Sequence, residues 1–246
     1  MFPIRDHNPS GRWPFVTYVL IAANVAVFAL FNLSMGEREL AYFFYDWGFV
    51  PRFVTEGLSL QGIVTHMFLH GGWMHLLGNM LFLFIFGDNL EDEMGHAGFA
   101  LFYALAGLAA VGLQYGADPA SDIPMVGASG AIAGVMGGYL LLFPKARVDV
   151  LIIIVIFFRI VPIPAWLVLG LWFGLQLVNG AMAPLDGGGV AYWAHVGGFV
   201  AGALMTLPIW LRRGGIGFWN RTHGAPPHPE ASYARSRVPQ VPRRPR

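Results

Sequence analysis

The chain has 246 residues, of which 56% are hydrophobic and only 12% charged, and its mean hydropathy is +0.56. Soluble globular domains contain about 25% charged residues, so this composition excludes an ordinary soluble domain and, for most of the length, a disordered, collagen-like or DNA-binding chain. The net charge is +1, and the absence of cysteine excludes disulfides, thiolate nucleophiles and cysteine-based metal sites.

Long apolar runs predict helices that span a lipid bilayer, which takes about 20 residues per helix. No small-residue cleavage site follows the first run at the distance expected for a signal peptide, so we expect it to be retained as a signal anchor. The expected fold class is all-α, a polytopic membrane protein with a six-transmembrane-helix bundle. The six predicted spans, in chain order, are residues 15–33, 69–86, 97–115, 127–143, 163–178 and 190–211.

A seventh apolar stretch, residues 148–161, is too short for a span and has the length of a re-entrant or interfacial segment. If it does not cross the bilayer, 13 of the 15 basic residues lie on one side, including all eight arginines from Arg212 onward. The positive-inside rule then places both termini in the cytoplasm. The expected location is a bacterial inner or plasma membrane.

Three regions follow from these spans. Residues 1–14 form a cytoplasmic N-terminal segment, and residues 15–211 form the membrane domain. Residues 212–246 are basic and rich in proline and arginine, a composition that predicts a disordered cytoplasmic tail.

Polar side chains inside the spans are costly in lipid and therefore indicate a functional site. Ser129 opens the fourth predicted span, His195 lies near the start of the sixth, and His75 and Asn79 lie early in the second. These three spans begin on the same side of the membrane, so the four side chains are expected at similar depth.

Small residues at every fourth position predict that the fourth and sixth spans approach each other closely. Such an approach would bring Ser129 and His195 within the hydrogen-bond distance that nucleophilic catalysis requires. Simple helix packing without catalysis would give the same spacing. The residues in these columns are Gly130, Gly134 and Gly138 in the fourth span, and Ala194, Gly198 and Gly202 in the sixth.

His75 and Asn79 are four residues apart and share one helix face. Together with the Ser129 backbone N–H they suit an oxyanion hole, although they would equally serve as hydrogen bonds between helices. His66 and His70 have the same spacing, but no acidic residue completes a metal-binding set, so we expect no metal. We expect His70 to brace the junction between loop and helix.

Three motifs resemble those of the rhomboid intramembrane serine proteases, in the family's order and across residues 15–211. They are "HGGWMHLLGNM" around His75 and Asn79, "GASGAIAG" around Ser129, and "AHVGGFVAG" from Ala194. The resemblance implies a Ser129–His195 dyad in a water-filled cavity, acting on transmembrane protein substrates in the lipid bilayer. No metal, other cofactor or nucleic acid is expected, and the oligomeric state is not predicted.

The resemblance also extends to Glu91 and Gly95 in "EDEMG", a glutamate and glycine that brace the bundle in the family. Within the six predicted spans no Asp or Glu is available to orient His195, which favours a dyad over a triad. The residues expected to support the site structurally are His70, Glu91, Gly95, Gly127, Gly130, Gly198 and Gly202.

Two features depart from the family's pattern. Some members carry an adjacent Trp–Arg pair in the first loop, whereas Trp47 and Arg52 are separated here. Some members have a tyrosine four residues after the nucleophile, stacked on the histidine, and this position is Ala133. The competing hypothesis is a non-catalytic binding protein or chaperone that uses the same cavity to hold membrane helices.

Overall fold

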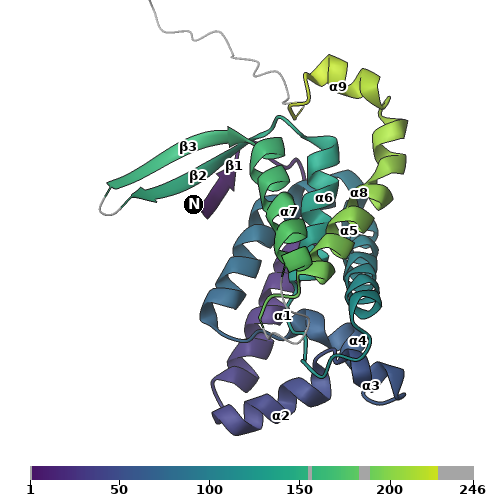
Figure 1. Cartoon of the computed structure of the whole chain (residues 1–246). Helices are drawn as coiled ribbons and strands as arrows, with labels where there is room; N and C mark the ends of the chain where they lie inside the picture. Colours follow the sequence, from purple (N-terminus) through teal and green to yellow (C-terminus); the bar gives the residue numbers. More distant parts are fainter. Residues whose placement is uncertain (1, 155–156, 183–188, 227–246) are drawn as a thin grey trace, which may run out of the picture.

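The computed structural model describes residues 2–154, 157–182 and 189–226, which form an upright helical bundle with a small sheet at one end (Figure 1). The helices are α1 (Phe15–Asn32), α2 (Glu37–Trp47), α3 (Pro51–Thr55), α4 (Gly62–Thr65), the short 3₁₀ helix η1 (His66–Phe68), α5 (Trp73–Ala117), α6 (Ser129–Leu142), α7 (Ala165–Met182), α8 (Tyr192–Arg212) and α9 (Ile216–Thr222). The strands are β1 (Phe2–Asp6), β2 (Arg147–Ile154) and β3 (Phe157–Pro164).

Four of the described helices, α1, α5, α7 and α8, are long and apolar enough to cross a membrane. α6 is also apolar but shorter. α5 contains two predicted spans, residues 69–86 from Trp73 onward and residues 97–115, and its backbone leaves the helical conformation between them at Gly95. Gly95 has φ +71°, a left-handed conformation that glycine adopts without the steric cost of a Cβ.

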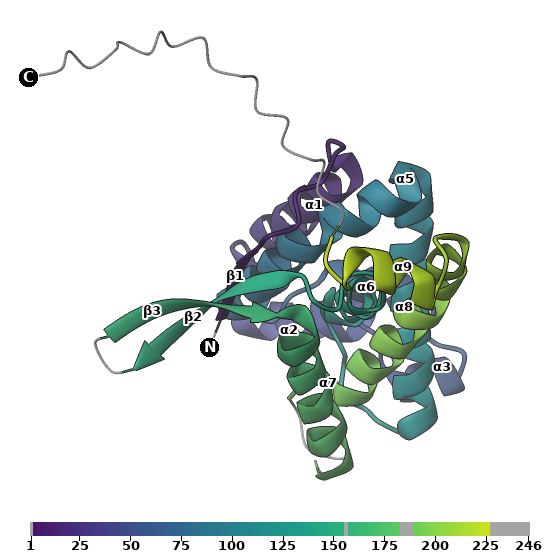
Figure 2. The same cartoon turned by 90° about the horizontal axis from the view of Figure 1, so that it is seen from above.

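α6 occupies the centre of the bundle, with α5, α7 and α8 arranged around it in the view along its axis (Figure 2). Nearly all of its side chains are buried, and it packs on α5 and α8. A Cβ added at Gly198 or Gly202 of α8 would overlap the carbonyl oxygen of Gly130 or Gly134 of α6, respectively. The predicted close approach of these two helices is therefore confirmed. It is possible because Gly198 and Gly202 have no side chain.

Glu91 joins α1 to α5. Its carboxylate accepts hydrogen bonds from the backbone N–H groups of Val16 and Thr17, each at 2.8 Å, and from the Thr17 hydroxyl at 2.7 Å. α1 begins after Pro14 with no side-chain cap of its own, so Glu91 satisfies N–H groups that the helix itself leaves free. These contacts tie the start of α1 to α5 close to the kink at Gly95.

The prediction of an all-α fold is wrong at one end of the bundle, where β1, β2 and β3 form an antiparallel sheet in that order. Of residues 148–161, predicted to be re-entrant or interfacial, the described residues 148–154 and 157–161 belong to the paired strands β2 and β3, which project sideways from the helices (Figures 1 and 2). This stretch is rich in β-branched residues and phenylalanine, which favour strands. Asp149 of β2 holds the N-terminal segment through Arg5 Nη2 at 2.7 Å and His7 Nε2 at 2.8 Å.

The predicted tail is ordered in its first part. Within residues 212–226, α9 packs on the end of α6, where Phe218 is buried and Trp219 Nε1 donates a hydrogen bond to the Leu141 carbonyl at 3.0 Å. The prediction of disorder is therefore wrong for α9. The remaining tail residues, 227–246, lie outside the described part of the chain.

Candidate active site

Ser129 and His195 come together at the contact between α6 and α8. Ser129 is the first residue of α6 and His195 lies in the first turn of α8. The Ser129 Oγ is 2.7 Å from the His195 Nε2, and His195 is buried. The pair thus has the geometry of a hydroxyl that donates a proton to an imidazole.

Gly127 shapes the turn that leads into Ser129. Its φ is +128°, and its N–H donates a hydrogen bond to the His66 carbonyl at 2.9 Å. A Cβ at this position would lie 2.7 Å from the His75 Nε2, which is closer than two such atoms can approach. Only glycine therefore fits the conformation and the space together.

His75 and Asn79, on the first turns of α5, line the same cavity as Ser129. The His75 Nε2 and the Ser129 Oγ both lie within 3.5 Å of the point where a Gly127 Cβ would be. In the described part of the chain, the buried Asn79 Nδ2 has no hydrogen-bond partner. An unpaired buried donor costs free energy, so this one is available to a group that enters the cavity.

The cavity has a volume of about 640 Å³ and opens beside Ser129 and His195. Its wall includes Trp172 of α7, whose ring centroid lies 5.7 Å from that of His195 at an interplanar angle of 35°. Trp172 thus supplies an aromatic neighbour for the imidazole. Ala133, at the position where some family members have a stacked tyrosine, has no aromatic ring.

Gln176 of α7 is a site residue that sequence reasoning missed. Its Oε1 lies 2.8 Å from the His195 Nδ1, on the other side of the imidazole from Ser129. A search for Asp or Glu overlooks an amide oxygen. The available signal was a strongly polar side chain within an apolar span, the same criterion that identified Ser129 and His195.

His66 lines the same cavity, and His70 packs next to His75. The His66 Nδ1 is 3.0 Å from the Gly62 carbonyl, and the His70 ring packs edge-on against His75 with centroids 5.0 Å apart. The His70 carbonyl accepts a hydrogen bond from Asn32 Nδ2 at 2.8 Å, which links α1 to the segment before α5. No group of three or more His, Cys, Asp or Glu residues suited to a metal ion occurs within the described ranges.

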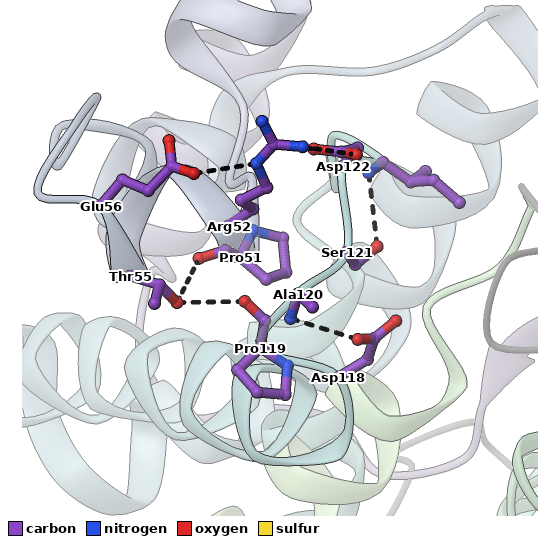
Figure 3. Close-up of polar contacts among 10 residues, drawn as sticks. Pro51, Arg52, Thr55, Glu56, Asp118, Pro119, Ala120, Ser121 and Asp122 are labelled. Carbon is purple, nitrogen blue, oxygen red and sulfur yellow. Dashed lines mark hydrogen bonds and ion pairs between the residues drawn. The ribbon is translucent and has the colours of Figure 1, made fainter.

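A polar clamp holds the loop before Ser129 against α3 (Figure 3). Arg52 Nη1 contacts both carboxylate oxygens of Asp122, at 2.9 and 3.0 Å, and Arg52 Nε contacts Glu56 at 3.0 Å. Thr55 donates a hydrogen bond to the Pro119 carbonyl at 3.0 Å. Arg52 therefore anchors this loop without an adjacent tryptophan.

Comparison with known proteins identifies the family. Residues 58–212 match the model of the Rhomboid domain. The chain is 34% identical over 193 residues to "Rhomboid protein 1, mitochondrial" of Saccharomyces cerevisiae, an alignment that covers 77% of this chain and 51% of the relative.

Two Bacillus subtilis proteins are also similar. The identity is 42% over 78 residues with "Putative rhomboid protease YdcA", covering 32% of this chain and 39% of the relative. It is 26% over 204 residues with "Rhomboid protease GluP", covering 82% of this chain and 36% of the relative. The chain thus spans about half the length of the yeast relative and less of these two. The matched domain covers more than half of the chain and contains Ser129, His195, His75 and Asn79, so this membrane protein belongs to the rhomboid family.

Proposed function

We propose that the protein is an intramembrane serine endopeptidase that hydrolyses peptide bonds in or near transmembrane helices of other membrane proteins. The observation that carries this proposal is the 2.7 Å separation of the Ser129 Oγ and the His195 Nε2 beside a cavity within apolar helices. The names of the two Bacillus relatives, which both describe rhomboid proteases, support it.

In the proposed mechanism Ser129 is the nucleophile and His195 the general base. The Ser129 Oγ forms a bond to the carbonyl carbon of the substrate while its proton passes to the His195 Nε2. The tetrahedral intermediate then collapses, the C–N bond breaks, and His195 returns the proton to the leaving amine. Water, deprotonated by His195, hydrolyses the acyl-enzyme and restores the serine.

The oxyanion of the tetrahedral intermediate would be stabilised by His75, Asn79 and the Ser129 N–H. Ser129 is at the N-terminus of α6, where backbone N–H groups have no partner within the helix and the helix dipole favours negative charge. The unpartnered Asn79 Nδ2 in the described structure and the position of His75 beside Gly127 support this assignment.

The expected substrate is a membrane helix with a locally weak backbone. In a regular helix every carbonyl is hydrogen-bonded, and lipid offers no replacement partner, so the helix must unwind before Ser129 can attack. We therefore expect small or helix-breaking residues at the cleavage site.

The proposed topology has six spans, provided by α1, the two parts of α5 on either side of Gly95, α6, α7 and α8. The membrane domain would comprise residues 15–211, between an N-terminal segment (1–14) and a tail (212–246). With the basic residues on one side, both termini lie in the cytoplasm of a bacterial cell. The sheet and α9 lie together at one end of the bundle, which supports a common side for the two chain ends (Figure 1).

A fluorophosphonate probe separates this protease from a non-catalytic helix-binding protein. The probe forms a covalent bond only with an activated serine. We expect the purified protein to be labelled, and both Ser129→Ala and His195→Ala to abolish labelling while keeping the thermal transition of the wild type. Absence of labelling in well-folded wild-type protein would favour the binding protein.

A further inference from the structure

Gln176 is a polar side chain on the buried face of α7, which it shares with Leu169 and Gly180. It is 8% exposed, whereas its neighbours Leu175 and Leu177 are 50% and 39% exposed. A buried amide is costly unless it is hydrogen-bonded. The atom that it meets in the bundle is the His195 Nδ1, at 2.8 Å.

The neighbouring backbone determines which end of the Gln176 amide faces His195. The Gln176 Nε2 lies 3.5 Å from the Trp172 carbonyl oxygen, one helical turn earlier. A carbonyl oxygen only accepts hydrogen bonds, so the NH₂ group belongs on that side. The amide oxygen is then directed at the His195 Nδ1.

This orientation fixes the protonation of the imidazole. An amide oxygen only accepts, so a hydrogen bond to it requires a proton on the His195 Nδ1. The neutral ring then has its lone pair on Nε2, which faces the Ser129 hydroxyl at 2.7 Å. This is the tautomer that a general base for Ser129 needs.

We propose that Gln176 is a positioning residue that holds the tautomer and the ring orientation of His195, so that Ser129, His195 and Gln176 act as a hydrogen-bonded triad. The inference rests on the proposed function. When His195 takes the proton from Ser129, the Gln176 oxygen also faces the positive charge that develops on the ring. A neutral amide does this without placing a second buried charge among apolar helices, which would carry a large desolvation cost.

The alternative is that Gln176 only satisfies its own hydrogen bonds and helps α7 to pack. A purely structural residue would affect the amount of folded protein and the thermal transition. It would not change how the rate depends on pH, since that dependence reports the protonation of the catalytic base.

The test uses the full-length protein in proteoliposomes with a transmembrane reporter substrate. Gln176→Leu removes the acceptor at nearly constant size. We expect kcat to fall by about 10- to 100-fold with KM nearly unchanged, because the base loses its preferred tautomer. The acidic limb of the pH–rate profile should move to lower pH, because the protonated ring loses a partner.

Two further variants make the result specific. Gln176→Glu keeps an acceptor at the same distance and should restore part of the rate with the acidic limb moved to higher pH. Asn179→Leu makes a similar change at an exposed position three residues along α7 and should leave the rate and the profile unchanged.

Ser129→Ala, measured in parallel, separates the two proposals. If Ser129→Ala still cleaves the reporter, the proposed function is wrong whatever Gln176 does. If Ser129→Ala is inactive but Gln176→Leu keeps the wild-type rate, the positioning role is wrong. A slower Gln176→Leu enzyme with an unshifted acidic limb would also overturn the positioning role and indicate packing alone.

Discussion

At the scale of single residues, the proposed mechanism requires a general base and oxyanion donors to lie in the same cavity. His195 meets Ser129 through one ring nitrogen and Gln176 through the other, so its surroundings specify a direction for proton transfer. His75 and Asn79, which line the same cavity, project from one face of α5. The proposed general base and the proposed oxyanion donors lie on different helices, so each proposal can be tested by substitution without removing the other residues.

Replacing an oxyanion donor should slow the chemical step. We expect His75→Ala and Asn79→Ala each to lower kcat by about 10²- to 10³-fold, because a lost donor removes stabilisation that exists mainly in the transition state. KM should change little. Steady-state cleavage of the reporter measures both constants.

Leu77→Ala is the matched control, since Leu77 lies between these residues on α5 but is 56% exposed. It should keep the wild-type kcat. An unchanged kcat in both His75→Ala and Asn79→Ala would remove the oxyanion assignment while leaving Ser129 and His195 untouched.

At this scale the sequence was informative where a residue type was unusual for its surroundings. Ser129 and His195 stand out because polar groups are rare in apolar spans, and the structure brings them within hydrogen-bond distance. Gln176 has the same signal, but its partner is 19 residues away on another helix. No spacing rule within one helix connects the two, so their contact is a property of the tertiary structure.

Among the elements, the contact between α6 and α8 decides the geometry of the site. The two backbones touch at Gly130 and Gly198, and again at Gly134 and Gly202, and Ser129 and His195 lie at the start of this contact. A side chain inserted there would push the helices apart and separate Ser129 from His195.

Gly198→Ala should therefore destabilise the protein by about 1–3 kcal/mol, the usual cost of overpacking, and should lower cleavage strongly. The added methyl group would collide with the Gly130 carbonyl, and rigid backbone cannot move aside as a side chain can. Thermal unfolding in detergent and cleavage in proteoliposomes measure the two effects.

Gly112→Ala is the corresponding control, because a Cβ at Gly112 of α5 would have no atom within 4 Å. Alanine is favoured over glycine in helices by up to about 1 kcal/mol, so this variant should be at least as stable as the wild type. Equal behaviour of the two alanine variants would contradict the role of the α6–α8 contact.

Helices and their packing were predictable because lipid imposes a length and small residues leave a regular spacing. The sheet was not. Residues 148–161 have the hydropathy of a membrane segment, and β1, which pairs with β2, lies more than 140 residues away along the chain. The β1–β2 pairing leaves no local pattern in the sequence, whereas the β-branched residues of β2 and β3 were a local signal for strands that the high hydropathy masked.

Over the whole molecule, the sheet is joined to the bundle through a titratable contact. The Tyr139 hydroxyl of α6 donates a hydrogen bond to Asp6 Oδ2 of β1 at 2.6 Å. Burial outweighs this hydrogen bond and raises the pKa of Asp6 from 3.8 to about 7. The folded protein therefore retains a proton on Asp6 at pH values where the unfolded chain has lost it.

This difference predicts that stability falls as the pH rises between about pH 4 and pH 7, since the folded state binds more protons there. The change should be on the order of 4 kcal/mol, because the shift is about three pKa units and one unit corresponds to about 1.4 kcal/mol. Asp149 has the opposite shift, a pKa lowered mainly by its hydrogen bonds with Arg5 and His7, and its contribution is constant above its ordinary pKa of 3.8.

Asp6→Asn should keep the hydrogen bond from Tyr139 and remove this part of the pH dependence. The comparison requires thermal unfolding of wild type and variant at several pH values in the same detergent. Parallel curves for the two proteins would show that Asp6 does not titrate in this range.

Cleavage by Ser129→Ala is the most direct test of the central claim that a serine within the helical bundle hydrolyses membrane-protein substrates. Wild type and variant, at equal amounts and with matching thermal transitions, are reconstituted in proteoliposomes with a transmembrane reporter. We predict cleavage by the wild type and none above background by Ser129→Ala. Equal cleavage by both proteins would contradict the account.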